Sequence, residues 1–280
     1  MRHILLYLLL AGGLASCSAE FFNQESDAYQ IPFERKLVLH ALLTPQDPLI
    51  IVDVRLNEPA TGLPSADAPL DGRVTDAEVM LFGPQDSITL PYFQRRGVAG
   101  YAVPAEDFTL TPGTVYQIEA RWNGLLATGS LRIPDAAPSP GTIALDIYES
   151  EENDFPETIV QTTIANLPGE EDHYLIYHDI EDLDSTGTVT SRQRDLIDYL
   201  RGTDRQGDRL IFKEFGFRNE SRNILRICTI EPAYFRYLDT RFQGSLVDEN
   251  PFAEPVNVFT NVEGGLGVVA GGNCLKIILQ

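Results

Sequence analysis

Residues 250–272 read Asn250-Pro-Phe-Ala-Glu-Pro-Val-Asn-Val-Phe-Thr-Asn-Val-Glu-Gly-Gly-Leu-Gly-Val-Val-Ala-Gly-Gly272. Val256 to Thr260 is predicted as a proline-bounded strand, followed by a turn and a second apolar strand that glycines interrupt. Gly264, Gly265 and Gly267 fall within four positions. Because glycine adopts positive φ cheaply but loses much conformational entropy on folding, the backbone is predicted to bend here or to lie against another backbone. The stretch therefore predicts a structural closure of the second, C-terminal domain and not a ligand loop, and it contains no catalytic constellation.

The N-terminus carries an export signal. A positive charge precedes a short apolar run, which is typical of a secretory signal and too short for a membrane span. The run ends in Leu14-Ala-Ser-Cys17, which matches the bacterial lipobox at every position. An ordinary cleaved signal with an incidental cysteine is the alternative. We expect residues 1–16 to be the signal peptide, Cys17 to be lipidated, and residues 17–33 to form the lipidated tether.

Ser18 follows the cysteine, where an Asp would favour retention at the inner membrane of many Gram-negative bacteria. The sequence therefore predicts an outer-membrane protein that contacts the membrane through its N-terminal lipid. Whether the protein faces the periplasm or the cell surface is undetermined.

The charge of the chain excludes one class of partner. There are 41 acidic and 21 basic residues, a formal net charge of −20. Such a chain is repelled by nucleic-acid phosphates and gains nothing from anionic lipid headgroups. We expect no nucleic-acid partner.

The pattern of the body is mostly β. In residues 34–133 about seven short apolar or alternating segments occur, and Asn123-Gly124 is a hairpin turn signal. This spacing predicts an N-terminal immunoglobulin-like β-sandwich. Residues 134–141 hold three prolines and are predicted as a Pro-rich linker. Residues 142–280 are predicted as a β-rich C-terminal domain with one or two short helices.

Two segments of the second half have helical spacing. Residues 231–242 place apolar side chains at i, i+3 and i+4, and Pro232 suits a first helical turn. In residues 191–202 the spacing of Leu196, Ile197 and Leu200 permits a second, short helix.

The histidines do not form a recognisable catalytic or metal motif. His40 lies in an apolar segment and is interpreted as a core residue. His173 and His178 are five residues apart, which places them on opposite faces of a strand. No Gly-x-Ser-x-Gly motif occurs, so no catalytic residue is assigned. An envelope hydrolase whose triad is assembled by folding stays open, because a triad needs only spatial proximity.

The acidic segment 179–187 holds the weak metal candidates Asp182 and Asp184. With Gly187 they resemble the opening of a calcium loop, but the twelfth position is Gln193 and not a bidentate Glu. A solvated turn is the favoured interpretation, and no metal or cofactor is expected.

Cys228 and Cys274 remain once Cys17 is acylated. The compartment outside the cytoplasm is oxidising, so the two can form a disulfide across 46 residues, worth ~4 kcal/mol in the chain-entropy model. Two separate buried thiols are the alternative. The aromatic residues of the predicted helix, Tyr234, Phe235, Tyr237 and Phe242, can line either a core or a sugar-binding face.

The lipobox, the β pattern and the segments Asn250–Val256 and Thr260–Val268 together resemble a Bacteroidota lipoprotein family, domain of unknown function 4249. The residues that carry the likeness are Pro251, Phe252, Glu254, Pro255, Asn261, Glu263, Gly264, Gly265 and Gly267. An aromatic residue often follows Gly-Leu-Gly in this family, whereas Val268 and Val269 stand here. No activity is assigned to the family, so no catalytic residue is carried over.

The resemblance implies an accessory lipoprotein of the kind often encoded beside TonB-dependent outer-membrane transporters. We therefore expect a non-enzymatic docking or substrate-capture module with a TonB-dependent transporter as partner. A stand-alone carbohydrate- or peptide-binding surface lipoprotein is the first alternative, and an envelope hydrolase is the second. The ligand is unknown from sequence.

Overall fold

The computed structural model describes residues 33–58, 72–95, 98–150, 157–165, 172–201, 204, 209–215, 221–248 and 256–279. Contacts between Cα atoms divide the chain into one unit of Met1–Glu34 with Glu58–Ser65 and a second of Arg35–Asn57 with Ala66–Gln280. The fold below is that of the second unit. Cys17 and residues 249–255 lie outside the described residues.

The strands of the first half are β1 (Leu37–Leu43), β2 (Leu49–Leu56), β3 (Glu78–Phe82), β4 (Ser87–Thr89), β5 (Tyr92–Arg95), β6 (Val98–Pro104), β7 (Val115–Trp122) and β8 (Leu125–Arg132). The second half contains η2 (Pro140–Thr142), β9 (Ile143–Ser150), β10 (Glu157–Ala165), β11 (His173–Leu183), β12 (Val189–Arg201), β13 (Arg209–Phe215), β14 (Arg222–Ile230), α2 (Pro232–Asp248), β15 (Val262–Glu263) and β16 (Leu266–Ile278). The fold is mostly β, as predicted.

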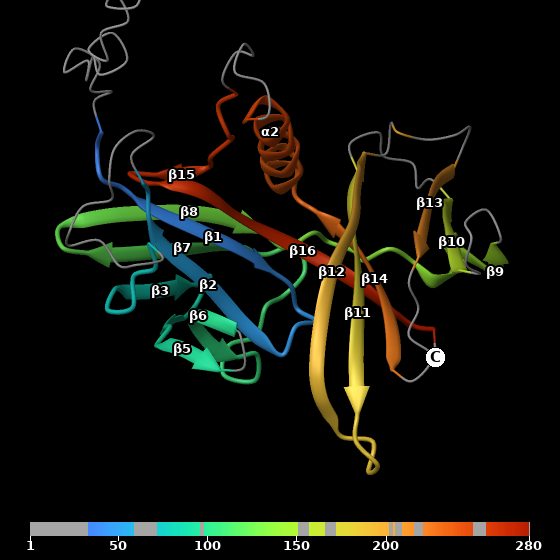
Figure 1. The fold of residues 1–280 in the computed structure, drawn as a ribbon. Coiled ribbons are helices and arrows are strands. Elements are labelled where there is room, and N and C mark those ends of the chain that lie inside the picture. Colours follow the sequence, from blue (N-terminus) through green and yellow to red (C-terminus); the bar gives the residue numbers. More distant parts are fainter. Residues whose placement is uncertain are drawn as a thin grey trace, which may run out of the picture. The chain divides into compact units, whose positions relative to one another are not determined.

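The described strands form three sheets (Figure 1). The longest has the order β12-β11-β14-β16-β1-β2-β6-β5, the second β15-β8-β7-β3-β4, and the third β13-β10-β9. Alternate residues of β1 and β2 are buried, with the pattern expected when one face of a strand packs on a second sheet. The layout is sandwich-like, which agrees with the expected class. The immunoglobulin-like assignment of the first half stays a prediction.

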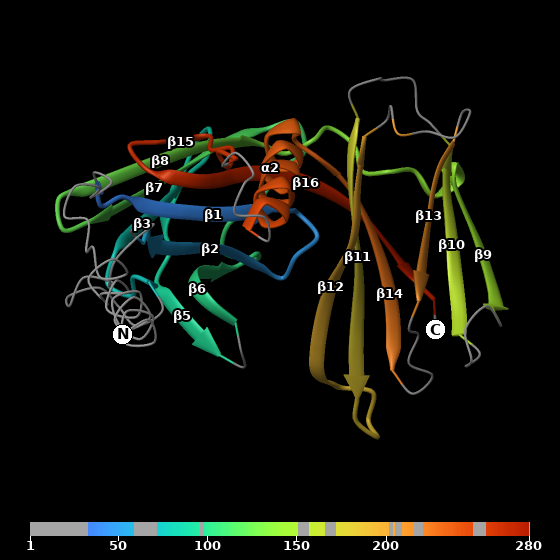
Figure 2. The same ribbon diagram turned by 45° about the horizontal axis from the view of Figure 1, so that its top comes forward.

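Strand β16 connects the two halves of the long sheet. Its first residues pair in parallel with β1, from Val38↔Leu266 to Leu43↔Gly271, and its last residues pair antiparallel with β14. Figure 2 shows β16 beside β1 at one end and beside β14 at the other. Strand β16 therefore joins strands that lie on both sides of the predicted linker at 134–141 into one sheet. The predicted domain limits themselves stay a prediction.

Hydrophobic side chains fill separate clusters on the two faces of the long sheet. Val269 belongs to the core that β1 and β2 share with β7 and β8. Val268 and Ala270, on the other face of β16, pack with Tyr234 and Phe235 of α2. The third sheet packs on the long sheet through a cluster that includes Ile164. One strand therefore contributes to two cores, because its successive side chains point to opposite faces.

Helix α2 confirms the helix predicted from residue 231 onward, and it extends further, to Asp248. The second helix, proposed for residues 191–202, is wrong, because this segment belongs to strand β12. The register between β11 and β12 shifts at Ile197, so the bulge changes which face the following residues occupy. Ile197 and Leu200 consequently pack in one cluster while Leu196 is 46 % exposed. The bulge thus places Ile197 and Leu200, three residues apart, on one face of a strand, and the same spacing is typical of one face of a helix.

The strand predicted for Val256–Thr260 is also wrong, since no regular strand occurs there. The backbone N–H of Phe259 donates to Thr240 Oγ1 at 2.9 Å, and the Arg236 guanidinium lies 4.3 Å from the centre of the Phe259 ring. This segment therefore packs along α2.

Candidate functional site

Asn261 holds the glycine-rich turn together. Its side chain donates to Val269 O at 2.7 Å and accepts from Val269 N–H at 3.0 Å, and its own N–H donates to Gly267 O at 3.3 Å. The amide thereby replaces a backbone pair of a β ladder. Glu263 is exposed and pairs with Thr128 of β8. The predicted signature residues Pro251, Phe252, Glu254 and Pro255 lie outside the described residues.

The glycines lie where the backbone leaves no room for a side chain. Gly267 has φ +102°, and a Cβ there would overlap the Leu39 carbonyl and stand 3.0 Å from its carbon. A Cβ on Gly265 would lie 2.6 Å from Leu37 O and 2.8 Å from the Ala127 Cβ. Gly264 has φ +69°. The glycines fit β16 closely against β1 and β8, which belong to the first half, whereas the sequence predicted a closure of the second domain.

Cys228 and Cys274 form a disulfide in the structure, with an S–S distance of 2.07 Å. They are directly opposite each other on β14 and β16 and belong to the cluster beneath α2. The bridge thus links the strand that ends the chain to the strand before α2.

An ion-pair network that the sequence analysis missed joins the β1–β2 turn to the long sheet. Asp179 on β11 is fully buried and pairs with Arg194 Nε at 2.7 Å and with Arg226 Nε. Asp47 in the turn accepts from Arg194 Nη2 at 3.0 Å and from Arg226 Nη1 at 2.9 Å. Burial acts to raise the pKa of Asp47, but the two guanidiniums outweigh it and lower the pKa. Two carboxylates and two arginines thus form a closed ring.

The network corrects the interpretation of residues 179–187 as one solvated turn. Strand β11 continues to Leu183, and Glu181 is buried between Arg192 and Arg222. Only the end of the segment is a turn. The sequence did show a charged residue, Asp179, within an otherwise apolar strand. Its partners Arg194 and Arg226, however, lie on other strands. Sequence spacing does not reveal such partners.

Asp182 and Asp184, the weak metal candidates, are engaged with neighbouring polar groups. Asp184 Oδ1 accepts from the N–H groups of Thr186 and Thr188 at 2.8 and 2.9 Å. The Thr186 hydroxyl also donates to Asp184 Oδ1 at 2.6 Å, and this bond, followed by the two backbone bonds, lowers the pKa of Asp184. Together the bonds cap the β11–β12 turn. Asp182 accepts from the hydroxyls of Ser191 and Ser221. Within the described part of the chain, no group of three His, Cys, Asp or Glu residues could hold a metal ion.

The histidines pack among other side chains. His40 lies 5.9 Å and 5.4 Å, between ring centres, from Tyr234 and Tyr237, and burial lowers its pKa. His173 packs against Phe235 at 4.8 Å. The His178 Nε2 lies 3.0 Å from Asn223 Oδ1. These contacts are those of packed strand residues.

Tyr234 of α2 and Tyr177 of β11 pack in the cluster between the helix and the long sheet. Burial raises the pKa of Tyr234 to about 12, and burial also raises the pKa of Tyr177. Tyr234 and Phe235 therefore belong to a core, whereas Phe242 is 54 % exposed. The helix does not present its aromatic residues as one exposed platform.

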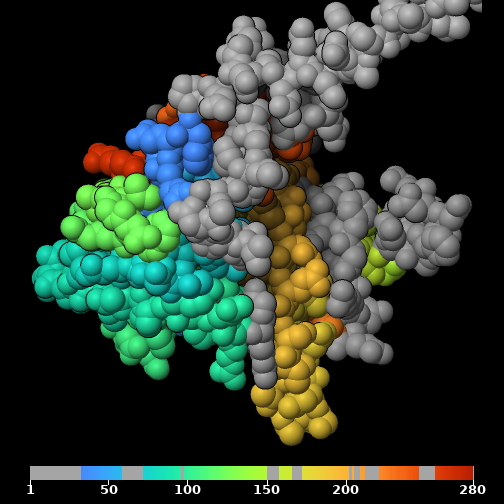
Figure 3. Space-filling model, turned by 60° about the vertical axis from the view of Figure 1, so that its left-hand side comes forward, coloured from blue at the N-terminus to red at the C-terminus, as the bar shows by residue number. Residues whose placement is uncertain are grey.

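The end of the β7–β8 hairpin borders a shallow surface depression. Asn123 (φ 45°) and Gly124 (φ 80°) form the two-residue turn that the sequence predicted, between the paired residues Trp122 and Leu125. Beside this turn is an open depression of about 390 Å³. Figure 3 shows this side of the molecule, where β7 and β8 (green) lie next to β3 (teal). The lining includes Asp76, Glu78, Arg121, Trp122, Leu125 and Leu126.

The Trp122 side chain is fixed by a hydrogen bond and by packing on the core. Its Nε1–H donates to Asp76 Oδ1 at 2.7 Å, and the ring packs against the core of the first half. Arg121 donates from Nε to Glu119 Oε1 at 2.7 Å and pairs across the ladder with Glu78. We did not identify this depression from sequence. Its signal was the single tryptophan of the chain, placed directly before Asn-Gly.

Among the described residues, no helix is long and apolar enough to cross a membrane. A comparison with curated proteins found no match. A solved structure, trypsin-activated alpha-2-macroglobulin from Escherichia coli, is similar at 10 % identity with a TM-score of 0.26. The match covers 72 % of this chain and 15 % of that protein, and a score this low carries no argument. The model of the family described as domain of unknown function (DUF4249) matches residues 20–277, so the chain belongs to this family.

Proposed function

We propose that this protein is a lipid-anchored outer-membrane lipoprotein that serves a TonB-dependent transporter as a non-enzymatic docking or substrate-capture module. The observation that carries the proposal is the lipobox Leu14-Ala-Ser-Cys17 behind a signal sequence. Each buried methylene of an acyl chain contributes about 0.8 kcal/mol, so multiple chains on Cys17 would hold an acidic body at the membrane.

The interior of the body supports a binding role more than a catalytic one. Asp47 and Asp179 are each paired with two arginines, and Glu181 is held by two more. His40 and His173 pack against aromatic rings. Groups of this kind stabilise a fold when fully paired, and a general base would need access to a substrate.

Fractionation of cells that express Cys17→Ala tests the anchor. We expect the variant in the soluble fraction, because neither the tether nor the acidic body has another affinity for lipid. Ser18→Ala is the matched control and should stay with the outer membrane, since it leaves the cysteine intact. Sedimentation of Cys17→Ala with the outer membrane after a high-salt wash would contradict the anchor.

Co-purification after crosslinking in native membranes tests the partner. We expect a TonB-dependent transporter to be recovered with the wild-type protein and lost with Cys17→Ala. Recovery of the lipoprotein without any transporter would refute the accessory role. It would favour the second candidate, a stand-alone carbohydrate- or peptide-binding lipoprotein, which the depression beside Trp122 supports.

A further inference from the structure

Strand β12 forms one edge of the long sheet. Among the described strands, β11 is the one strand that pairs with it. Residues 190–196 of β12 are all exposed. The β11–β12 hairpin also projects beyond β14, because the pairing of β11 with β14 ends at Glu181↔Arg222 (Figure 1). The outer edge of β12, meaning the side of residues 190–196 turned away from β11, is therefore able to accept an additional strand.

One face of this edge is positively charged. Arg192 and Arg194 lie across the ladder from Glu181 and Asp179, and their guanidiniums bind those carboxylates. The Arg192 side chain is 40 % exposed, whereas the Glu181 side chain is 4 % exposed and that of Asp179 is fully buried. Solvent therefore meets the arginines more than the carboxylates that they bind. Leu196 follows on the same face and is also exposed.

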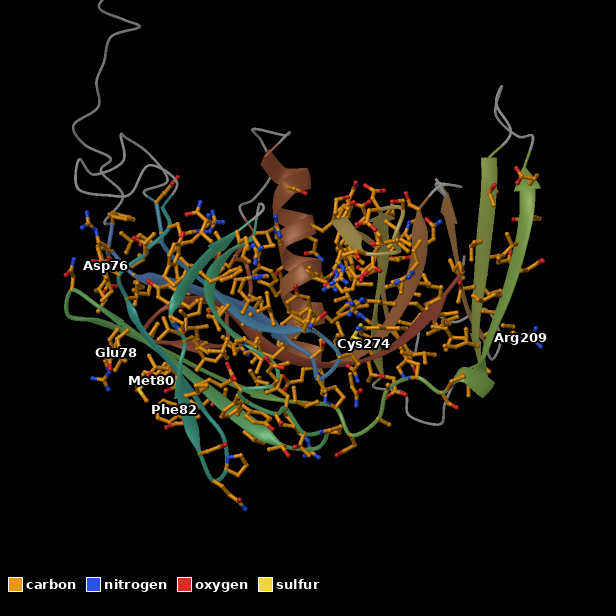
Figure 4. The ribbon with its side chains drawn as sticks, turned by 90° about the horizontal axis from the view of Figure 1, so that it is seen from below. Asp76, Glu78, Met80, Phe82, Arg209 and Cys274 are labelled. Carbon is orange, nitrogen blue, oxygen red and sulfur yellow. A yellow bond between two sulfur atoms is a disulfide. The ribbon has the colours of Figure 1, made fainter. Side chains whose placement is uncertain are left out.

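Further cations extend the positive face toward the middle of the long sheet. Arg222 on β14 shares the Glu181 carboxylate with Arg192. Lys276 follows two residues after Cys274, which Figure 4 labels, so both side chains point to this face of β16. The cluster has five cations and three carboxylates, in a chain whose net charge is −20. Its members are Arg192, Arg194, Arg222, Arg226 and Lys276, with Asp47, Asp179 and Glu181.

The order of side chains along the edge specifies the chemistry of a matching strand. Arg192, Arg194 and Leu196 occupy alternate positions, about 7 Å apart, so a strand paired with β12 would set its own alternate side chains beside them. A guanidinium has five N–H donors and matches a carboxylate in shape, and both arginines have donors beyond those that their ion pairs use. The matching segment thus carries acidic side chains at two alternate positions and an apolar one at the next.

Other occupants use this edge less completely. Antiparallel pairing of two β12 strands about Gln193 would place Arg192 opposite Arg194, and like charges directly opposite each other destabilise a sheet. A free phosphate or a lipid headgroup can bind the guanidiniums, but it does not form a ladder with the backbone N–H and C=O groups of the edge. Charge and backbone together therefore favour an acidic protein segment.

We propose that the outer edge of β12 docks an extended acidic segment of a partner protein, which adds a strand to the long sheet and pairs its carboxylates with Arg192 and Arg194. The inference rests on the proposed docking role for the identity of the partner. Its test uses the purified protein, so failure of this inference can be told from failure to recover a transporter.

A synthetic peptide is the probe. It alternates glutamate with threonine, has a leucine at each end and carries a fluorescent label. Fluorescence anisotropy follows its titration with the full lipidated protein in a non-ionic detergent. We expect saturable binding that weakens as salt is added, because exposed ion pairs are screened. The same peptide with glutamine for glutamate should bind at least tenfold more weakly.

Methylation of the peptide backbone tests the addition of a strand. In a strand, the N–H groups of alternate residues point to the same edge. One peptide is methylated on the glutamate nitrogens and a second on the threonine nitrogens. Because the glutamates must face the arginines, we expect one methylated peptide to lose binding and the other to keep it.

Variants assign the binding to this edge. Arg192→Gln should raise the peptide Kd about tenfold or more, and Arg192→Lys should keep part of the affinity because it keeps the charge. Leu196→Asp is the second variant, since Leu196 is exposed and a carboxylate there would repel the peptide without removing a partner of Glu181. Arg132→Gln is the matched control, an exposed arginine of β8 paired with Asp135, and it should leave the Kd unchanged. Circular dichroism checks that each variant is folded.

Four results would overturn the proposal. The first two are no saturable binding of the acidic peptide, and an unchanged Kd in folded Arg192→Gln or Leu196→Asp. The third is an equal effect of the two backbone methylations, which would exclude an added strand. The fourth is displacement of the labelled peptide by orthophosphate or glycerol phosphate at lower concentration than by unlabelled peptide, which would assign a phosphate or lipid-headgroup site instead.

Discussion

Replacing Gly267 by alanine tests whether the glycine-rich block closes the fold. The residue has φ +102°, a conformation that is unfavourable for a residue with a Cβ. The added Cβ would also meet the Leu39 carbonyl, which belongs to the paired strand β1. A backbone atom cannot rotate away as a side chain can, so β1 and β16 would have to separate locally.

The cost has two parts. A left-handed residue costs about 1–2 kcal/mol for an L-amino acid, and overpacking a tight site costs about 1–3 kcal/mol. Gly267→Ala should therefore lose about 2–5 kcal/mol of unfolding free energy. For a body of this size about 2–4 °C of Tm corresponds to each kcal/mol, so Tm should fall by about 4–20 °C.

Gly124→Ala separates the two parts. Gly124 has φ +80°, but a Cβ there would have nothing within 4 Å. This variant should show only the backbone cost, about 1–2 kcal/mol. Both proteins are compared with the parent by thermal and urea unfolding, followed by far-UV circular dichroism. If Gly267→Ala melts no lower than Gly124→Ala, the close approach to β1 is not what requires glycine, and the block must be considered as a ligand loop.

Three further perturbations follow from the same structure. Gly244→Ala in α2, where a Cβ meets nothing within 4 Å, should stabilise the protein by about 0.5–1 kcal/mol in urea unfolding; a loss would mean that the helix interior is crowded. Replacing Cys228 and Cys274 together by serine should cost about 4 kcal/mol, as expected for a closed loop of 46 residues, and an unchanged melt in non-reducing buffer would contradict a stabilising bridge. Asp47→Asn should cost about 1–3 kcal/mol at neutral pH, less than a fully buried pair because Asp47 is 18 % exposed. Since the folded pKa of Asp47 lies below its ordinary value near 3.8, its stabilisation is present above that value and is lost as pH falls through the folded pKa. Acid titration of stability should therefore converge for parent and variant, and parallel curves down to pH 2 would rule this out.

Much of the local structure could be predicted from short windows of sequence. Strict alternation from Val115 to Trp122 and the Asn123-Gly124 turn specify a hairpin, and the structure contains it. Pro232 and the following apolar spacing specify the start of α2. These signals are local, because turn dihedrals and helical periodicity depend on residues only a few positions apart.

The site residues were less accessible to sequence. Asp179 reads as part of an acidic turn until Arg194 and Arg226 are placed beside it by neighbouring strands. Asp47 and Arg226 are separated by 179 positions, yet they form a contact of 2.9 Å. The depression beside Trp122 likewise requires Asp76, two residues before β3, to reach the end of β7. These contacts cannot be predicted from spacing along the chain, because the order of the strands in the sheets determines which residues become neighbours.

The sequence by itself determined the β class, the hairpin, the helix, the family signature and the need for glycine near Gly267. Tertiary structure alone decided that β16 pairs with β1 and β14 together, and that residues 256–260 lie along α2 and not in a sheet. Residues 191–201 likewise became an edge strand when β11 offered a ladder of hydrogen bonds. The physical reason is that local sequence sets only a preference of about 1 kcal/mol per residue or less, whereas backbone pairing and burial against a distant segment are worth more.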